Sequence, residues 1–202
     1  MPPELGARHR GLPSANRAAV ARYAEQDARA AAFLDRDGVL NVDMGFTHRP
    51  EDLRFTPTAV EAVRLLNAAG YFVIVVTNQS GIARGHYGVE DVERFHDQML
   101  RTLSEQGARI DRFYYCPYHP DGTIPAFAIE HDTRKPGSGM LMQAMRDLPI
   151  RREGSFMIGD RQSDLDAAAA AGVPALLVET NACDLAASVR SMLAEHAFGE
   201  IG

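Results

Sequence analysis

Short apolar runs alternate with helix-like segments from Ala31 onward, and this alternation limits the possible folds more than any other feature of the chain. The run from Tyr71 to Val76 is continuous and rich in β-branched residues, as in a strand buried on both faces. The pattern predicts strands at 31–34, 71–76, 112–115, 155–158 and 175–178, and helices at 57–69, 89–106, 139–148, 163–171 and 185–196. Strands joined by helices need right-handed crossovers, which build a parallel sheet with helices on both faces. The sequence therefore predicts a doubly wound α/β fold.

The first 30 residues differ from the rest of the chain. Residues 1–13 are rich in Pro, Gly and Arg, as in a flexible tail. Ser14 can cap a helix over residues 15–30, although its apolar face is weak. We interpret residues 1–30 as an N-terminal arm and residues 31–202 as one domain.

Composition and charge exclude several classes of protein. The 202 residues suffice for a real hydrophobic core, and no apolar run approaches the roughly 20 residues that span a bilayer. The segment from Met1 to Arg10 lacks the apolar core of a signal peptide, and two cysteines are too few for a disulfide framework. The net charge of −6 argues against binding to nucleic acid or to an acidic membrane. We expect a cytoplasmic protein, either a monomer or a weak homo-oligomer.

Polar clusters follow three of the predicted strands, at 35–37, 77–80 and 160–164. In parallel sheets, ligands bind beyond the carboxyl ends of the strands, so these clusters should meet at one edge. Asp35 and Asp37 would repel each other unless a cation lay between them, and Mg²⁺ accepts such carboxylates. Asp160 is the third candidate ligand, and Asp164 could hold Asp160 or a metal-bound water. A single aspartate in such a place is more often a helix or turn cap, but three clusters at strand ends favour a site.

These carboxylates suggest a definite chemistry. A carboxylate such as that of Asp35 can attack phosphorus and form an aspartyl-phosphate. Asp37 is then placed to protonate the leaving oxygen and to activate water. Only one of the 21 basic residues, Lys135, is a lysine. Either this reflects coding bias or a compact ammonium group is needed there.

Four segments of the sequence resemble the motifs of the haloacid dehalogenase (HAD) superfamily, in the same order. They are FLDRDGVLNVD at 33–43, VVTNQSGIARG at 75–85, TRKP at 133–136 and GDRQSD at 159–164. The resemblance implies a Rossmann-like HAD phosphatase in which Asp35 is the nucleophile and Asp37 the general acid/base. It also implies that Thr77 holds the phosphoryl group, that Lys135 is its cation and that Asp160 binds Mg²⁺. Val39 stands where many members carry Thr, which affects packing more than chemistry.

Flanking residues resemble those of the heptose 1,7-bisphosphate 7-phosphatases, with histidinol-phosphate phosphatases as near relatives. Both groups lack a large cap domain, and the short segments between the motifs leave no room for one here. The resemblance implies that the substrate contacts Asp43, Met44, Gly45, Phe46, Asn78, Gln79, Ser80, Arg134 and Arg161. Arg134 would bind the phosphate that is not cleaved, because a guanidinium pairs with phosphate through two hydrogen bonds.

The loop between residues 117 and 133 departs from the pattern of these relatives, which bind a structural zinc through Cys-x-His and Cys-x-Cys. Here Cys116 is followed by Pro and Tyr, His119 comes one position late, and the second pair reads His131-Asp132-Thr133. Structural zinc normally needs four nitrogen or sulfur ligands. We therefore expect no zinc at Cys116, His119 and His131, and a loop closed by packing of its aromatic and proline residues.

Two alternative functions remain open from the sequence. The first keeps the chemistry but changes the substrate to histidinol phosphate or another small phosphate ester. The second is a catalytically silent domain that binds a partner through residues 1–30. A silent domain would be expected to have lost a catalytic group. The sequence keeps all five that the resemblance implies, which are Asp35, Asp37, Thr77, Lys135 and Asp160.

Overall fold

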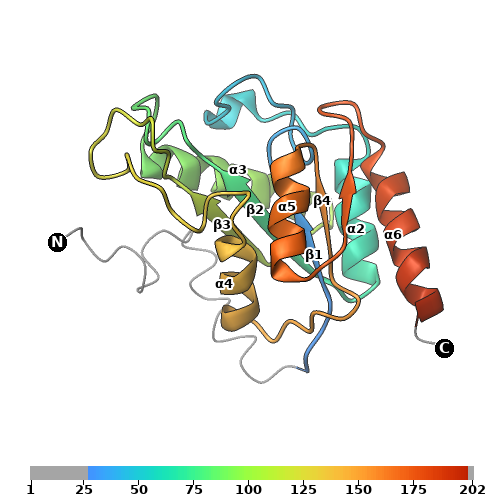
Figure 1. The fold of residues 1–202 in the computed structure, drawn as a ribbon. Helices are drawn as coiled ribbons and strands as arrows, with labels where there is room; N and C mark the ends of the chain where they lie inside the picture. The colour runs from blue at the N-terminus through green and yellow to red at the C-terminus, as the bar shows by residue number, and fades with distance from the viewer. Residues whose placement is uncertain (1–26, 200–202) are drawn as a thin grey trace.

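Five parallel strands form the sheet of the protein, for which the computed structural model describes residues 27–199 (Figure 1). The strands are β1 (Ala31–Leu34), β2 (Phe72–Asn78), β3 (Arg112–Cys116), β4 (Phe156–Gly159) and β5 (Ala175–Leu177). Their order is β3-β2-β1-β4-β5, and every neighbouring pair is parallel. The predicted α/β fold is confirmed, and each predicted strand lies within two residues of its observed bounds.

Helices cover both faces of this sheet. They are α2 (Ala59–Ala68), α3 (Val89–Glu105), α4 (Gly139–Asp147), α5 (Gln162–Ala171) and α6 (Leu185–Gly199), with a short 3₁₀ helix, η1 (Pro50–Asp52), that the sequence pattern did not predict. Figure 1 shows α4 and α5 in front of the sheet, α2 and α3 behind it, and α6 beside α2. None of the described helices is both long and apolar enough to cross a membrane.

Two hydrophobic cores form because alternate residues of each strand point to opposite faces. In β1, Ala32 and Leu34 join the core against α2, α3 and α6. Ala31 and Phe33 join the other core against α4 and α5. All four side chains are completely buried, so the strand at the centre of the sheet is apolar on both faces.

The predicted helix over residues 15–30 is wrong at its C-terminal end, and its remaining residues lie outside the described part of the chain. Residues 27–30 are not helical, and Arg29 forms a parallel bridge with Ile150. The Arg29 N–H donates to Pro149 O at 3.0 Å, and Arg29 O accepts from the Arg151 N–H at 2.9 Å. The backbone of Arg29 therefore pairs with the segment around Ile150 as a strand does, and a helical backbone at Arg29 could not make this pairing.

The chain order creates a crevice beside β1. The chain runs outward from β1 to β2 and β3, and then returns to the other side of β1 to form β4. Loops that leave β1 and β4 therefore diverge in opposite directions, the arrangement that opens ligand sites in α/β proteins. Asp35 directly follows β1 and Asp160 directly follows β4.

Candidate active site

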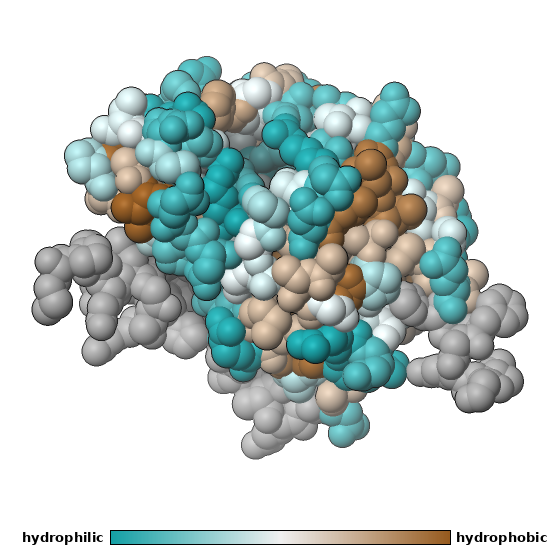
Figure 2. Space-filling view, viewed as in Figure 1, coloured by the Kyte–Doolittle hydropathy of each residue, from teal (hydrophilic) through white to brown (hydrophobic). Residues whose placement is uncertain are grey.

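A pocket of about 600 Å³ opens at the carboxyl ends of the strands. Hydrophilic side chains surround the hollow at the upper edge of the molecule in Figure 2. The lining residues come from the end of β2, from the segments that follow β1, β2, β3 and β4, and from the start of α5: Asp35, Asp37, Asp43, Gly45, Phe46, Thr77, Asn78, Ser80, Arg84, Tyr87, His119, Arg134, Lys135, Pro136, Arg161, Ser163 and Asp164. Polar groups from distant parts of the sequence thus meet in one place.

Lys135 joins two carboxylates at the base of this pocket. Its Nζ lies 2.9 Å from Asp35 Oδ1 and 2.6 Å from Asp164 Oδ1, and it donates a hydrogen bond to Val76 O at 2.9 Å. Burial alone would lower the pKa of Lys135, but the two carboxylates together raise it above its usual value. The ammonium group therefore stays charged although it is only 3% exposed.

Asp35 is itself 7% exposed, and its carboxylate accepts from Lys135 and from a backbone N–H group. Burial raises the pKa of Asp35 to about 7, Lys135 opposes this rise, and Asp164 adds to it. Its Oδ1 also accepts a hydrogen bond from the Arg36 backbone N–H at 2.7 Å. A further positive charge at this point would favour the ionised, nucleophilic form.

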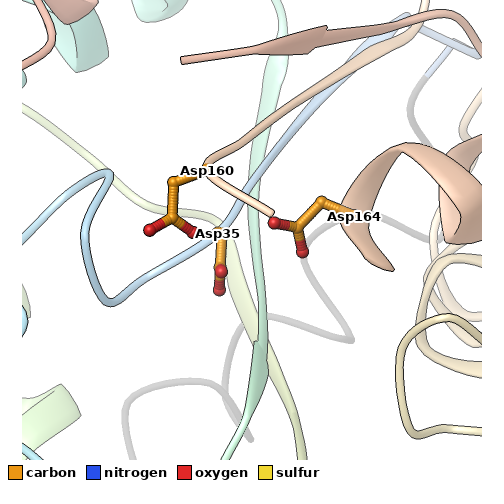
Figure 3. Close-up of side chains that lie close together, drawn as sticks. All are labelled: Asp35, Asp160 and Asp164. Atoms are coloured by element: carbon orange, nitrogen blue, oxygen red, sulfur yellow. The ribbon is translucent and has the colours of Figure 1, made fainter. Parts of the chain in front are cut away.

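Asp35, Asp160 and Asp164 form an acidic group whose ligand atoms all lie within 4.8 Å of one another. Figure 3 shows the three side chains close together, with Asp35 from the end of β1, Asp160 from the end of β4 and Asp164 from the first turn of α5. Asp160 Oδ2 accepts from Thr180 Oγ1 at 2.8 Å, whereas the buried Asp160 Oδ1 accepts no hydrogen bond among the described residues and has only the Arg161 guanidinium at 3.9 Å. Oxygen ligands with an unused acceptor suit a hard cation such as Mg²⁺.

Space for this acidic group depends on a glycine. A Cβ atom at Gly38 would lie 2.3 Å from Asp160 Oδ2, and the φ of +86° at Gly38 also disfavours any other residue. The turn after β1 can therefore approach the loop after β4 only with glycine at this position.

Asp37 lies at the same rim, but its carboxylate is held by neighbouring side chains. It forms an ion pair of 2.8 Å with Arg36 and accepts hydrogen bonds from Asn41 Nδ2 at 3.0 Å and Gln79 Nε2 at 2.9 Å. Among the described residues, the acidic group with metal-ligand spacing does not include Asp37. The side chain still lines the pocket and is 19% exposed, so it can reach a bound molecule.

Most of the residues predicted to contact the substrate do line the pocket. They are Asp43, Gly45, Phe46, Asn78, Ser80, Arg134 and Arg161, together with Thr77 from the predicted catalytic set. Arg161 Nη2 pairs with Asp43 Oδ2 at 3.2 Å and so joins the loops after β1 and β4. Met44 is 55% exposed and is not among the lining residues.

Gln79 differs from these residues because it is buried under the pocket rather than exposed in it. It is 1% exposed, its Nε2 donates to Thr77 Oγ1 at 2.9 Å as well as to Asp37, and its Oε1 accepts from Tyr87 Oη at 2.7 Å. Its side chain therefore orients two groups of the site.

Sequence reasoning did not identify Arg84, Tyr87 or His119 as pocket residues. Arg84 Nη2 lies 3.1 Å from His119 Nε2, so the loops after β2 and β3 meet at the rim. Arg84 belongs to the segment that resembles the second HAD motif, but nothing in its local pattern indicates which way its side chain points. The contact depends on β2 and β3 being neighbours in the sheet.

The positions that correspond to the zinc ligands of the relatives are Cys116, Tyr118, His131 and Thr133. They lie close together but make other contacts. The His131 ring stacks on Tyr118 with centroids 4.3 Å apart, and His131 Nδ1 lies 2.7 Å from Thr133 Oγ1. Burial raises the pKa of the Cys116 thiol. Tyr118 and Thr133, which stand where the relatives carry His and Cys, offer neither the nitrogen nor the sulfur that structural zinc takes. The donor set of this loop therefore does not fit a structural zinc site.

Comparison with known proteins identifies the family. A family model described as HAD-hydrolase-like matches residues 132–197. A curated D-glycero-beta-D-manno-heptose-1,7-bisphosphate 7-phosphatase from Rhodopseudomonas palustris is 46% identical over 157 residues, which are 78% of this chain and 87% of that protein. The chain belongs to the HAD superfamily. A protein of the same name from Escherichia coli K12 is 42% identical over 71% of this chain and 75% of its own length.

A solved structure supports the same assignment. The D,D-heptose 1,7-bisphosphate phosphatase from B. bronchiseptica, complexed with magnesium and phosphate, is 32% identical and matches with a TM-score of 0.71. The match covers 82% of this chain and 99% of that chain. The expectation of a HAD-type phosphoric monoester hydrolase is thus confirmed, in the same family as these heptose bisphosphate phosphatases.

Proposed function

We propose that this HAD phosphatase hydrolyses a sugar phosphate with Mg²⁺ through an aspartyl-phosphate on Asp35. The observation that carries the proposal is the placement of Asp35 within the acidic group and beside Lys135, in the lining of an open pocket. Lys135 would neutralise both the attacking carboxylate and the incoming phosphoryl oxygens.

The metal would be held by Asp35 and Asp160, with Asp164 beside them and tied to Lys135. The buried Asp160 Oδ1 supports this assignment, since it accepts no hydrogen bond among the described residues and the Arg161 guanidinium stays 3.9 Å away, which leaves room for a metal ion as its closer partner. When bound, Mg²⁺ supplies positive charge that offsets the charge on the transferring phosphoryl group.

The reaction would proceed in two steps. In the first, an Asp35 carboxylate oxygen forms a bond to phosphorus, the bond from phosphorus to the ester oxygen breaks, and Asp37 gives that oxygen its proton. In the second, Asp37 takes a proton from water as the water oxygen forms a bond to the phosphorus of the aspartyl-phosphate, and the bond from phosphorus to the Asp35 oxygen breaks. The products are the alcohol and inorganic phosphate, and both aspartates return to their starting states.

We further propose D-glycero-D-manno-heptose 1,7-bisphosphate as the substrate, cleaved at C7. The names of the relatives support this, and so does the charge at the rim of the pocket. Arg84, Arg134 and Arg161 all line the pocket in addition to Lys135, so cations remain for a second phosphate group. Asp43 and Phe46 line the same pocket and would contact the sugar.

A panel of substrates tests both levels of the proposal. Phosphate release would be measured from heptose 1,7-bisphosphate, heptose 7-phosphate and histidinol phosphate, each with Mg²⁺ and with EDTA. We expect the bisphosphate to have the highest kcat/KM, and Arg134→Met to remove most of this preference by raising KM. Equal kcat/KM for all three would refute the substrate, whereas unchanged Mg²⁺-dependent release by Asp35→Asn would refute the mechanism.

A further inference from the structure

Arg36 lies between the two aspartates of the site in sequence, yet its side chain is not part of the pocket. It is completely buried, and the pocket lining includes Asp35 and Asp37 but not Arg36. A buried guanidinium is costly unless its N–H groups are well paired. The partners of Arg36 therefore indicate what this side chain does.

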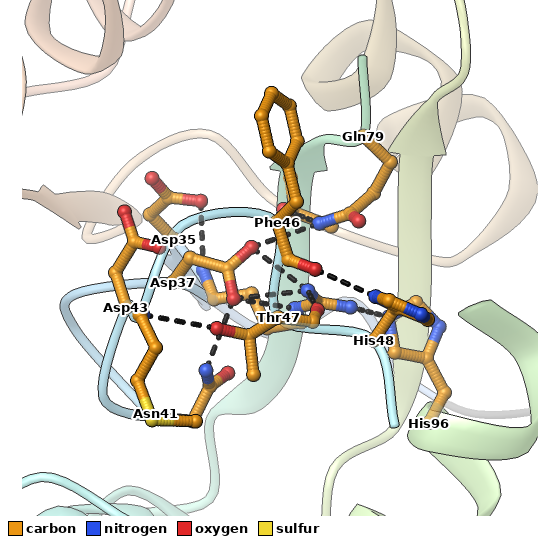
Figure 4. A network of polar contacts seen from close by, with 12 residues as sticks. Asp35, Asp37, Asn41, Asp43, Phe46, Thr47, His48, Gln79 and His96 are labelled. Atoms are coloured by element: carbon orange, nitrogen blue, oxygen red, sulfur yellow. Dashed lines mark hydrogen bonds and ion pairs between the residues drawn. The ribbon is translucent and has the colours of Figure 1, made fainter. Parts of the chain in front are cut away.

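Asp37 is the main partner, through both of its carboxylate oxygens. Arg36 Nε and Nη2 donate to Asp37 Oδ1 at 3.2 and 2.9 Å, and Nη2 also donates to Oδ2 at 2.8 Å. Asn41 adds a donor to Oδ1 and Gln79 adds one to Oδ2, as Figure 4 shows on the two sides of Asp37. Oδ1 thus receives three N–H donors and Oδ2 only two, which leaves Oδ2 as the freer oxygen for proton transfer.

The other side of the guanidinium is anchored in the protein interior. Arg36 Nη2 donates to Thr47 O at 2.6 Å, Nη1 lies 3.2 Å from His96 Nε2, and the guanidinium carbon lies 4.6 Å from the centre of the Phe95 ring. Because arginine can only donate, His96 Nε2 must accept this hydrogen bond, which requires a neutral ring. Burial and the charge of Arg36 both lower the pKa of His96 well below its usual value, so the ring remains an acceptor at neutral pH.

We infer that Arg36 is a positioning residue that fixes the carboxylate of Asp37 so that Oδ2 faces the reacting ester, an inference that rests on the proposed role of Asp37. The guanidinium never touches the substrate and acts only through Asp37. Without the hydrogen bonds from the Arg36 guanidinium, the Asp37 carboxylate is free to rotate about its side-chain bonds. A displacement of about 1 Å in a reacting group can cost on the order of 100-fold in rate.

A pair of aryl esters of similar shape separates this role from a general structural one. Phenyl phosphate releases a phenolate much like that of tyrosine, with a pKa of about 10, and needs help from an acid. p-Nitrophenyl phosphate needs little help, because the nitro group stabilises the departing anion. We expect Arg36→Met to lower kcat/KM by about 100-fold for phenyl phosphate and by less than about 10-fold for p-nitrophenyl phosphate. Arg36→Lys should recover part of the lost kcat/KM for phenyl phosphate, since lysine retains the positive charge but not the planar set of N–H donors.

The matched control is Arg112→Met. Arg112 is also completely buried, but its guanidinium has no hydrogen-bond partner among the described residues. Its backbone pairs with Ile74, away from the Asn78 end of β2 at the pocket. Its loss should change kcat/KM for both esters equally or not at all. Equal losses for the two esters in Arg36→Met would overturn the inference. If Arg36→Met does not fold, His96→Phe, which keeps the ring but removes the acceptor, should show the same selective loss at smaller size, and an equal loss there would overturn it.

Asp37→Asn distinguishes the inference from the function on which it rests. If Asp37→Asn affects both esters equally, the proposed acid role of Asp37 is wrong. If Asp37→Asn is selective for phenyl phosphate and Arg36→Met is not, the proposed function stands and the role assigned to Arg36 is wrong. Selective losses in both variants would support both.

Discussion

Replacing Lys135 with Met should reveal how two buried carboxylates are accommodated side by side. Lys135 Nζ is within 2.9 Å of Asp35 and 2.6 Å of Asp164, and its side chain is only 2% exposed. With an effective dielectric constant of about 20, each pair attracts by roughly 6 kcal/mol before desolvation is considered. Removing one partner of a buried ion pair costs about 3–5 kcal/mol net, because the charge left behind is uncompensated.

We therefore expect Lys135→Met to lower the free energy of unfolding at neutral pH by about 3–5 kcal/mol in EDTA. Excess Mg²⁺ should restore part of this loss, since it binds the folded state and supplies the missing positive charge. Mg²⁺ should accordingly stabilise the variant more than the wild type. Phosphate release should fall by at least about 100-fold even with Mg²⁺, since the ammonium also faces the phosphoryl group.

Urea unfolding followed by circular dichroism, with EDTA and with Mg²⁺, measures both effects. Arg112→Met serves as the control for loss of a buried cation away from the pocket. A Lys135→Met protein as stable as the wild type in EDTA would refute the electrostatic reasoning. Equal stabilisation of the two proteins by Mg²⁺ would refute the placement of the metal beside Lys135.

Three further predictions concern His96, Gly159 and Arg161. Burial holds the pKa of His96 well below 6.5, so protonation favours the unfolded chain below that pH. The wild type should therefore lose stability between pH 6.5 and pH 5, by up to about 2 kcal/mol, that His96→Phe does not lose, and equal pH dependence in urea unfolding would contradict this. A Cβ at Gly159 would lie 2.2 Å from Asp164 Cβ, so Gly159→Ala should destabilise by about 1–3 kcal/mol and reduce kcat; unchanged thermal unfolding would argue against this close approach. Arg161 is 64% exposed at its bridge to Asp43, so Arg161→Gln should leave stability within about 1 kcal/mol but raise KM for a sugar bisphosphate, and an unaltered KM would exclude it from binding.

The order of the elements could be predicted because each one is encoded locally. Continuous apolar runs marked the central strands, and glycines such as Gly70 marked the ends of helices. Apart from the short helix η1, the clearest error lies where a distant segment decides the conformation. Arg29 was assigned to a helix, but its backbone pairs with the segment around Ile150, more than 100 residues away.

The acidic part of the site was also accessible to prediction. Asp35 and Asp160 follow strands directly, and parallel strands bring their carboxyl ends to one edge. Lys135 comes from a segment without periodic structure, so its role rested on resemblance to the HAD motifs and on its being the only lysine. Its position depends on Asn78, whose side chain exchanges hydrogen bonds of 3.0 Å with the Lys135 backbone N–H and C=O.

The sequence by itself thus determined the parallel α/β fold, the carboxylates at the strand ends and the superfamily, because these depend on local pattern and short motifs. Only the tertiary structure decided how each charge is balanced. Arg36 and His96 are 60 residues apart and meet because α3 packs against the sheet beside β1. Asp37 and Asp35 are only two residues apart, yet they have different partners. The buried Arg36 holds Asp37, whereas Lys135 faces Asp35 in the pocket. Such pairings depend on which elements become neighbours, and that is a property of the packed chain rather than of any local segment.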